Sequence, residues 1–535
     1  MDDMLFRTED IQDEDIFKYY VETQRDIEIV TQLKSKTPVI LVGSRGVGKS
    51  FLMRVAEQEM LRDFEVDRVF PIYLTFHRSS LLRTNSDEQF KNWMMSHICN
   101  RLLRTIRRKG FALTGEVIEV FAGGKTREDD IEDAPIVKLS KAFDESWRSS
   151  DAIDSSAVPS IDEFKDAIQD LCEQINAKRI VILIDEAAHI LVPAQQRIFF
   201  SLFRDLRSPY LGIKAAVYPG ATYYGESFQA SHDATFVKLI RDIKDASYVS
   251  NMKAMIIKQI ENPVTLSNIE SRGDQFSILA YAASGNPRSL IKSLGLLGNI
   301  TSRSVENTIR TFYRDMIWAD HQNLAEKFPP LAEIIDWSRE FIDAAVIPDL
   351  LDKSSRYITL EKDTTCYFWV AKDIPATAKE GLRLLEYTGV IFEDAVGLIA
   401  TRRKVGTRYR VNLGCMFAKT SNSSLNYLDL ARNVTPKRMM EITSSHPLME
   451  EAAQINVSSE PDNNQILNLH LDKSIEVLDL TEFQKDRLRS IKIETVYDLL
   501  NATHEQLQKA HLVGEVRSRR MRDSAITSLF EYLSG

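Results

Sequence analysis

The chain has 535 residues, of which 44% are hydrophobic, and its formal net charge at pH 7 is -9. This length suffices for about three domains of ordinary size. The negative charge argues against a protein that coats nucleic acid over its whole surface, although it leaves room for local basic patches. The four cysteines lie far apart without a CxxC pair, so the sequence suggests neither a zinc module nor a disulfide framework.

The first residues are acidic and lack the basic and apolar regions of a signal peptide. No apolar run approaches the roughly 18 residues that a bilayer span requires. Together with the cysteine pattern, these features predict a cytoplasmic protein without a membrane partner.

The sequence GSRGVGKS at residues 43–50 follows directly on the aliphatic run Pro38–Val42. A glycine loop between a buried strand and a helix predicts a phosphate-binding P-loop. Gly43 and Gly48 allow backbone angles that direct N–H groups at phosphate oxygens, Lys49 supplies positive charge, and Ser50 offers a hydroxyl to Mg²⁺. The helix that starts near Phe51 adds its positive dipole end. We expect ATP and Mg²⁺ to bind here, at Gly43, Ser44, Arg45, Gly46, Val47, Gly48, Lys49, Ser50 and Phe51.

A second catalytic element is predicted at Arg179–Glu186, where five consecutive aliphatic residues precede two acids. The aliphatic run is typical of a central parallel strand that is covered on both faces. Asp185 at its carboxyl end can hold Mg²⁺ opposite Ser50. Glu186 is the predicted base that polarises the attacking water, so its presence favours ATP hydrolysis over mere nucleotide retention.

The surrounding pattern alternates strands and helices. Val69–Phe76 and Ile213–Tyr218 read as strands, and Ser160 with Glu163 predicts a capping-box start of a helix. Residues 78–159 exceed what one connection requires and are polar and loop-like in part, so we interpret them as an insertion. The pattern predicts an α/β domain with a parallel sheet over residues 1–250.

The sequence GNPR at residues 285–288 lies between two helical patterns. With the P-loop and the acidic strand, it resembles the origin-recognition or initiator-like branch of AAA+ ATPases, related to STAND proteins, over roughly residues 15–300. The resemblance implies a helical lid at 251–330 in which Arg288, the sensor 2 arginine, reaches the γ phosphate. It also implies a polar sensor 1, for which Thr222 is the candidate, although the usual Asn or Thr directly on the strand end is absent.

AAA+ proteins usually hydrolyse ATP at subunit junctions, so the resemblance also implies self-association. Arg241 lies where an arginine finger for a neighbouring subunit is expected. Arg204 and Arg207 are alternatives, and any of the three could equally be a solvated residue on a helix face.

Residues 335–418 resemble a winged helix-turn-helix domain. A helix at Ala376–Tyr387 and a strand at Val390–Phe392 precede two segments that flank a basic turn at 402–408. The resemblance implies DNA contacts by the helix and by the 402–410 basic cluster, although such a domain can instead only pack against the nucleotide domain. The predicted contacts are Lys379, Arg383, Arg402, Arg403 and Lys404. Residues 419–472, rich in Ser, Asn, Thr and Pro, are interpreted as a linker.

Residues 473–535 resemble the C-terminal domain of bacterial RNA polymerase α subunits and related helix-hairpin-helix modules, which indicates a bacterial source. The resemblance implies that the Gly514 backbone and the following arginines bind phosphate without reading sequence. The predicted contacts are Gly514, Arg517, Arg519 and Arg520. The hairpin has one glycine where many members have two, and docking of another protein is the alternative.

The predicted fold is therefore a multidomain α/β protein with an AAA+ parallel sheet, an α-helical lid, a winged helix and a small all-α helix-hairpin-helix domain. The favoured function is an oligomeric, ATP-dependent switch on duplex DNA that recruits or controls a partner. The alternative is a STAND-type signalling or defence ATPase whose C-terminal modules bind an effector protein. Such proteins usually carry a repeat sensor, and no repeat period occurs in this sequence.

Overall fold

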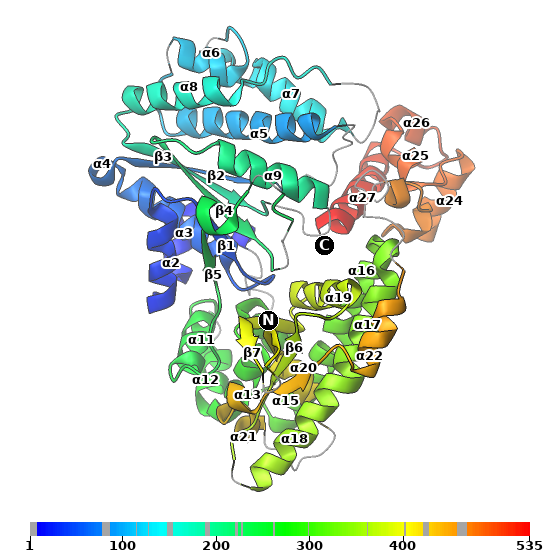
Figure 1. Cartoon of the computed structure of the whole chain (residues 1–535). Helices are drawn as coiled ribbons and strands as arrows, with labels where there is room; N and C mark the ends of the chain where they lie inside the picture. Colours follow the sequence, from blue (N-terminus) through cyan, green and yellow to red (C-terminus); the bar gives the residue numbers. More distant parts are fainter. Residues whose placement is uncertain are drawn as a thin grey trace. The chain divides into compact units, whose positions relative to one another are not determined.

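The computed structural model divides the chain into two compact units. One comprises Met1–Tyr73, Lys214–Thr222 and Ala230–Ser459, and the other Leu74–Ile213, Tyr223–Gln229 and Glu460–Gly535. Figure 1 shows the elements of both. The structure describes residues 8–76, 86–113, 115–126, 128–146, 153–187, 193–219, 223–225, 228–260, 263–297, 299–360, 362–400, 403–420, 427–456 and 468–534.

A five-stranded sheet carries the P-loop. Its order is β2-β3-β4-β1-β5, and β1 pairs in parallel with both β4 and β5. Every residue of β4 is buried, as expected for a strand between two covered faces. The prediction of a P-loop parallel sheet is confirmed. The strands are β1 (Val39–Val42), β2 (Val69–Thr75), β3 (Arg179–Asp185), β4 (Leu211–Val217) and β5 (Thr235–Lys238).

Short helices precede β1, and longer helices accompany the strands. The predicted capping box at the start of α8 is present, because Ser160 Oγ accepts from Glu163 N while the Glu163 carboxylate accepts from Ser160 N. α2 packs against α3. These helices are η1 (Thr8–Asp10), η2 (Asp13–Asp15), α1 (Ile16–Tyr19), α2 (Gln24–Lys34), α3 (Lys49–Arg62), α4 (Phe64–Asp67), α8 (Ile161–Gln174), α9 (Pro193–Asp205) and α10 (Ala230–Asp233).

In its described residues the insertion forms a helical layer, and part of its polar stretch, at 128–133, is a short helix rather than a loop. Its elements are α5 (Asp87–Arg108), α6 (Glu116–Ala122), η4 (Glu128–Asp133) and α7 (Pro135–Asp144). α5 packs against α6, α7 and α9. Its buried residues include Trp93, Ile98 and Leu102, which recur at helical spacing between exposed polar ones and stabilise the layer by burial.

A helical region follows β5 and contains two long helices, each interrupted by a π-helical segment. In the second of them, Pro348 lacks the N–H that an α-helical bond requires, which accounts for the π segment directly before it. The elements are α11 (Tyr248–Ile257), α12 (Pro263–Ser271), α13 (Gly273–Ala282), α14 (Pro287–Gly295), α15 (Ser302–Ile309), η6 (Arg310–Met316), α16 (Ile317–Lys327), η7 (Pro329–Leu331), α17 (Ala332–Glu340), η8 (Phe341–Val346) and α18 (Ile347–Thr359).

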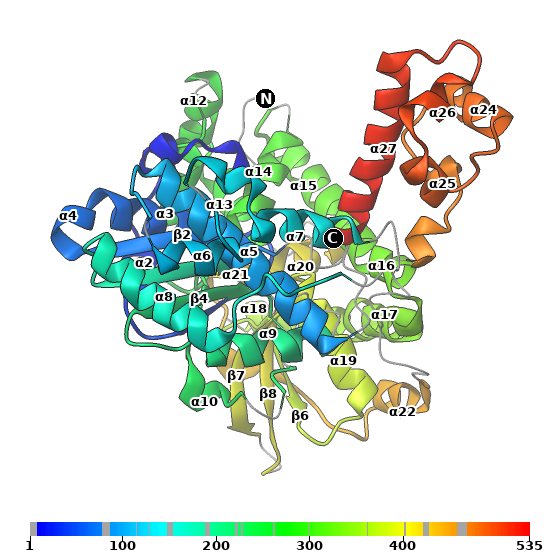
Figure 2. The same cartoon turned by 90° about the horizontal axis from the view of Figure 1, so that it is seen from above.

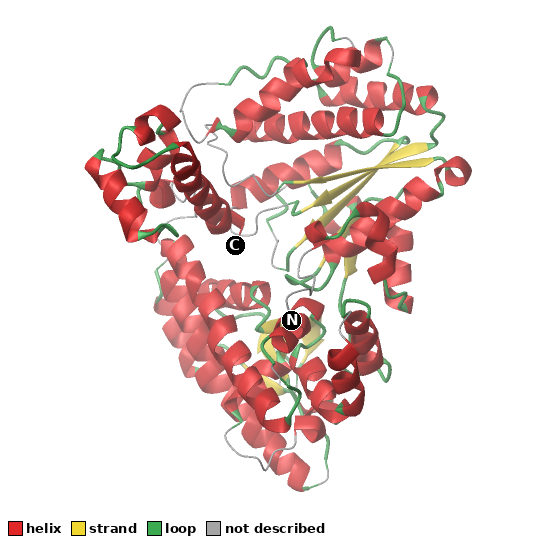
Figure 3. Ribbon diagram, turned by 180° about the vertical axis from the view of Figure 1, so that it is seen from behind, coloured by secondary structure: helices red, strands yellow, loops and turns green. Residues whose placement is uncertain are grey.

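A second sheet has the order β7-β8-β6-β9, with β7 and β8 forming an antiparallel hairpin. Figure 3 shows both sheets as yellow arrows among the helices. Helices and sheet share one hydrophobic core, in which α20 lies close enough to η6 that a Cβ at Gly414 would lie 2.3 Å from the Tyr313 ring. The elements are β6 (Tyr367–Ala371), α19 (Ala376–Tyr387), β7 (Ile391–Ile399), β8 (Val405–Val411), α20 (Leu413–Lys419), α21 (Tyr427–Arg432), η9 (Pro436–Arg438), β9 (Met440–Ile442) and α22 (Pro447–Gln454).

The interpretation of residues 419–472 as a linker is wrong for 427–456. β9 pairs in parallel with β6, with Phe368 opposite Met440, and Ile442 and Met449 are buried in the shared core. Of the polar stretches that suggested a linker, residues 443–446 form the turn between β9 and α22, and most of the others lie outside the described residues. This segment therefore completes the second sheet.

The C-terminal residues form a small all-α domain with its own core, as predicted. Its elements are η10 (Ile475–Val477), α24 (Glu482–Ser490), α25 (Val496–Asn501), α26 (His504–Gln508) and α27 (Glu515–Ser534). Capping boxes begin α24, α25 and α26, and Figure 2 shows α27 alongside α25 and α26. None of the helices in the described parts of the chain has the length and apolar character that crossing a bilayer demands.

Candidate nucleotide-binding site

The P-loop joins the end of β1 to the start of α3, which begins at Lys49. Gly46 and Gly48 have φ angles of +85° and +104°, a region that favours glycine. Gly43 meets a different constraint, because an added Cβ would lie 2.8 Å from Val47 Cγ2. The sequence predicted the glycine requirement at 43 and 48, but the backbone angle at Gly46 and the close approach at Gly43 emerge only in the structure.

Lys49 is buried within the loop. Its Nζ donates to the carbonyl oxygens of Gly43 at 2.6 Å and Ser44 at 3.2 Å, and it lies 4.2 Å from the centroid of the Tyr218 ring. Ser50 and Phe51 lie in the first turn of α3. An ammonium group beside the N–H groups of a helix start fits the phosphates of a nucleotide. Tyr218, directly after β4, was missed because an aromatic residue at a strand end resembles a core residue.

The predicted sensor 2 turn lies against the P-loop. Asn286 Nδ2 donates to the Arg45 carbonyl oxygen at 2.8 Å, and Arg288 N donates to the Gly46 carbonyl oxygen at 3.4 Å. Asn286 Oδ1 also caps α14 by accepting from Ser289 N. The structure therefore brings Arg288 beside the loop, and its action on the γ phosphate stays a prediction.

The other side of the same turn is bonded to the second sheet. Ser284, with φ +51°, accepts at its carbonyl from Arg410 Nη2 at 3.3 Å and at its Oγ from Leu413 N at 2.8 Å. Gly285 N donates to the buried Tyr248 hydroxyl at 2.8 Å. Arg410 is 6% exposed, so the predicted DNA contact by the 402–410 cluster is wrong for this residue.

Arg241 is tied to its own P-loop. Its guanidinium donates to the Val47 carbonyl oxygen at 2.6 Å and pairs with Asp26 at 3.3 Å. The side chains are 13% and 3% exposed. This arrangement does not fit a finger that reaches a neighbouring subunit, because the guanidinium is already occupied within the chain. Arg204 pairs with Asp205 at 2.6 Å, and Arg207 is exposed.

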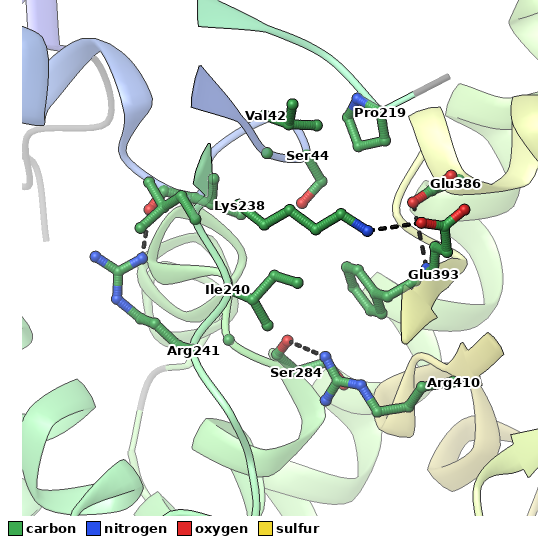
Figure 4. Close-up of a pocket in the computed structure, with 15 residues that line it drawn as sticks. Val42, Ser44, Pro219, Lys238, Ile240, Arg241, Ser284, Glu386, Glu393 and Arg410 are labelled. Carbon is green, nitrogen blue, oxygen red and sulfur yellow. Dashed lines mark hydrogen bonds and ion pairs between the residues drawn. The ribbon is translucent and has the colours of Figure 1, made fainter. Parts of the chain in front are cut away.

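A small pocket adjoins the P-loop, and Figure 4 shows the side chains that line it. It lies between Ser44, the end of β5, and side chains of α19, β7 and β8. Lys238 of β5 pairs with Glu393 of β7 at 2.6 Å. Burial, and then the charge of Glu393, raises the pKa of Glu386 to about 7. Ser44 Oγ and Arg410 Nη1 are buried and lack hydrogen-bond partners among the described residues.

Asp185 is 4% exposed at the carboxyl end of β3. Its Oδ1 accepts from Glu186 N at 3.0 Å, and Glu186 has a φ angle of +48°. A left-handed backbone at a residue other than glycine costs free energy, and such strain concentrates at functional sites. Thr222, the sensor 1 candidate, lies outside the described residues.

The predicted DNA contacts differ in how accessible they are. Lys379 and Arg403 are exposed, whereas Arg383 is 10% exposed and paired with Glu380, so it does not fit a DNA contact. Lys404 pairs with Asp373 at 2.8 Å. Arg402 lies outside the described residues.

In the C-terminal domain, Gly514 and Arg520 are exposed. Arg519 pairs with Glu515, and Arg517 donates to the Leu512 carbonyl oxygen at 2.6 Å.

All four cysteines are free and buried, and burial raises the pKa of the Cys172 and Cys366 thiols to about 12. Thiol chemistry is therefore not indicated at any of them. Within the described residues, no cluster of three or more His, Cys, Asp or Glu side chains could hold a metal ion.

One protein-family model matches part of the chain. Residues 4–105 match the ORC-CDC6-like family. The sequence matches none of the curated proteins with which it was compared.

The solved structures to which this chain is similar include the following three. A Walker-type ATPase of Pyrococcus abyssi is 14% identical, with 77% of this chain and 96% of that chain covered and a TM-score of 0.40. The Orc1 protein of Aeropyrum pernix in complex with DNA is 10% identical, with 76% and 92% covered and a TM-score of 0.28. A STAND protein with a tetratricopeptide repeat sensor from Pyrococcus horikoshii is 12% identical, with 96% and 64% covered and a TM-score of 0.24. At these TM-scores none of them assigns a function to this chain.

We expect Arg241→Met to lower the stability of the fold. We do not expect it to impair ATP hydrolysis in a neighbouring subunit. Removing one partner of a buried pair leaves the other charge without compensation and costs about 3–5 kcal/mol. Combining it with Asp26→Asn should recover part of that loss. Chemical denaturation measures both, with Arg432→Met as a control, because Arg432 pairs with Asp274 at the surface. Unchanged stability together with loss of activity in mixed oligomers would restore the finger role.

Glu386 predicts a pH dependence of stability. Its pKa is raised from 4.5 to about 7, so the folded protein binds the proton more tightly than the unfolded chain. Stability therefore falls as pH rises from 4.5 through 7. Glu386→Gln should be more stable than the parent at pH 8 by on the order of 3 kcal/mol and nearly equal at pH 4.5. Thermal unfolding across pH checks this; the exposed Glu450→Gln should show no such trend, and a pH-independent difference for Glu386→Gln would contradict it.

Proposed function

We propose that this AAA+ ATPase of the initiator-like, STAND-related branch hydrolyses ATP with Mg²⁺ and uses the nucleotide cycle as an oligomeric switch on duplex DNA. One observation supports the coupling. The turn at 284–288 is hydrogen-bonded to the P-loop through Asn286 and to β8 and α20 through Ser284. A movement of this turn on nucleotide binding would therefore also move the second sheet.

In this proposal Lys49 and the N–H groups at the start of α3 bind the phosphates. Ser50 and Asp185 hold Mg²⁺, which would neutralise charge on the β and γ phosphates. Glu186 positions and polarises the attacking water, and Arg288 stabilises charge on the γ phosphate. The exposed Arg207 replaces Arg241 as a candidate finger for a neighbouring subunit.

DNA is the proposed partner of the second sheet and the C-terminal domain. Lys379, Arg403, Arg520 and Gly514 are exposed, and we propose that these three cations and the Gly514 backbone contact phosphates without reading sequence. The paired arginines Arg517 and Arg519 lie on the same helix start. An effector protein would supply any output beyond ATP turnover.

A STAND-type signalling or defence ATPase is the second candidate. It is favoured by the packing of the second sheet on the P-loop end, through Lys238–Glu393 and Arg410–Ser284. This packing fits a second sheet that restrains the nucleotide site. In such a protein the C-terminal domain would bind a protein partner. The two candidates differ in their affinity for duplex DNA.

Two variants separate nucleotide binding from hydrolysis. Lys49→Ala removes the charge that holds the phosphates and should abolish tight binding of a fluorescent ATP analogue. Glu186→Gln should bind ATP like the parent but release phosphate at least about 100-fold more slowly, because the base is lost. The exposed Lys36→Ala and Glu116→Gln serve as matched controls. Equal turnover in Glu186→Gln and the parent would refute its role as the base.

Duplex DNA binding by Glu186→Gln distinguishes the two functions. With ATP and Mg²⁺ we expect DNA retention that differs from retention with ADP and that falls steeply as salt rises, because counterions are released on phosphate binding. Fluorescence anisotropy with a labelled duplex measures both. Negligible DNA affinity with either nucleotide would favour the signalling function instead.

A further inference from the structure

A second pocket, of about 490 Å³, lies near the tip of the β7–β8 hairpin. α18, η9, β9 and the turn after β7 line it. Its volume falls in the range of known ligand sites. Lys353, Tyr357, Lys437 and Arg438 contribute to its walls, and Glu441 is its acidic residue.

Local structure fixes the two cations of η9. Pro436 occupies its first turn, and Thr435 Oγ1 accepts from Lys437 N at 3.3 Å. Lys353 Nζ of α18 donates to the Met439 carbonyl oxygen at 3.1 Å, and the next residue, Met440, pairs with β6. The backbone that carries Lys437 and Arg438 is therefore held from both sides.

These cations are electrostatically available. Lys437, Arg438 and the nearby Arg403 are exposed, and none of them has an ion-pair partner within the described parts of the chain. The Arg438 guanidinium lies 5.4 Å from the Tyr357 ring centroid. Stacking on an aromatic face leaves the guanidinium edge free to donate to an anion.

The neighbouring basic residues, in contrast, already have acidic partners. Arg356 pairs with Asp352, and Lys404 pairs with Asp373. A cation that already faces a carboxylate must give up that partner to bind a phosphate, so its net gain is small. Lys353, Lys437 and Arg438 against the single Glu441 give the pocket an excess of positive charge.

We propose that this pocket binds a phosphate of a nucleic-acid backbone, with Lys437 and Arg438 as the phosphate contacts and Arg403 at the rim. Lys353 acts as a positioning residue that holds the η9–β9 backbone. The inference rests on the proposed DNA function and extends the DNA surface to a segment that composition had suggested was a linker. The contacts are with phosphate, so they add affinity without sequence preference.

The test is the double variant Lys437→Gln/Arg438→Gln in the full-length chain, with Glu186→Gln as background and ATP present. Its Kd for a labelled duplex should rise about tenfold or more, and the slope of log K against log salt should become shallower by about 1–2, the value for one or two lost phosphate contacts. The charge-retaining Lys437→Arg/Arg438→Lys should keep most of the affinity.

The matched control is Arg356→Gln/Lys362→Gln, which removes the same charge from the paired Arg356 and from the exposed Lys362. It should leave Kd and slope near the parent values. Unchanged DNA binding by the Lys437/Arg438 variant, or an equal loss in the control, overturns the pocket while the DNA function stands. A parent chain that binds no DNA overturns both, and a fall in ATP affinity in the variant would assign the residues to nucleotide binding instead.

Discussion

The hydrogen bond from Asn286 to the Arg45 carbonyl is the contact on which the arrangement of the nucleotide site depends. The P-loop can accept this neighbour only because Gly46 has no side chain, since a Cβ there would lie 2.8 Å from both Asn286 Oδ1 and Arg288 Cβ. The same turn also accepts a hydrogen bond from Arg410 Nη2 of β8 at the Ser284 carbonyl oxygen. A change in the shape of the loop therefore cannot leave the turn, or the strand beyond it, undisturbed.

A buried ion pair makes the contact between the P-loop and its neighbouring elements specific rather than merely stable. Arg241 joins Asp26 to the Val47 carbonyl in the buried pair, whereas the pair of Lys238 with Glu393, between β5 and β7, is partly exposed. Electrostatic contacts strengthen where water is excluded, but an unmatched partner there is costly. Phosphates arriving at the loop would add negative charge next to these pairs. A network of this kind can hold two distinct arrangements and be shifted between them by nucleotide.

The sequence predicted the elements that local pattern determines. The P-loop, the acid-tipped strand β3, the Ser160 capping box and the α19 helix all follow from residues within a few positions of one another. It failed where a side chain finds its partner far along the chain. Arg241 and Asp26 are 215 residues apart, and nothing in KLIRDIKD predicts that the arginine faces a P-loop carbonyl. β9 was missed because three residues carry too little periodicity.

The difference between residue composition and the partners that residues find in the fold also decides which cations can bind nucleic acid. A count of basic residues overstates the charge available to DNA, because Arg383, Lys404 and Arg519 already face carboxylates of the chain. In a protein with a net charge of -9, long-range attraction to a polyanion is weak, so affinity must come from places where cations lack acidic partners. Lys437 and Arg438 form such a place only because β9 pairs with β6 and brings η9 to the hairpin. The strand that the composition concealed thus creates the site that we propose for a nucleic-acid phosphate.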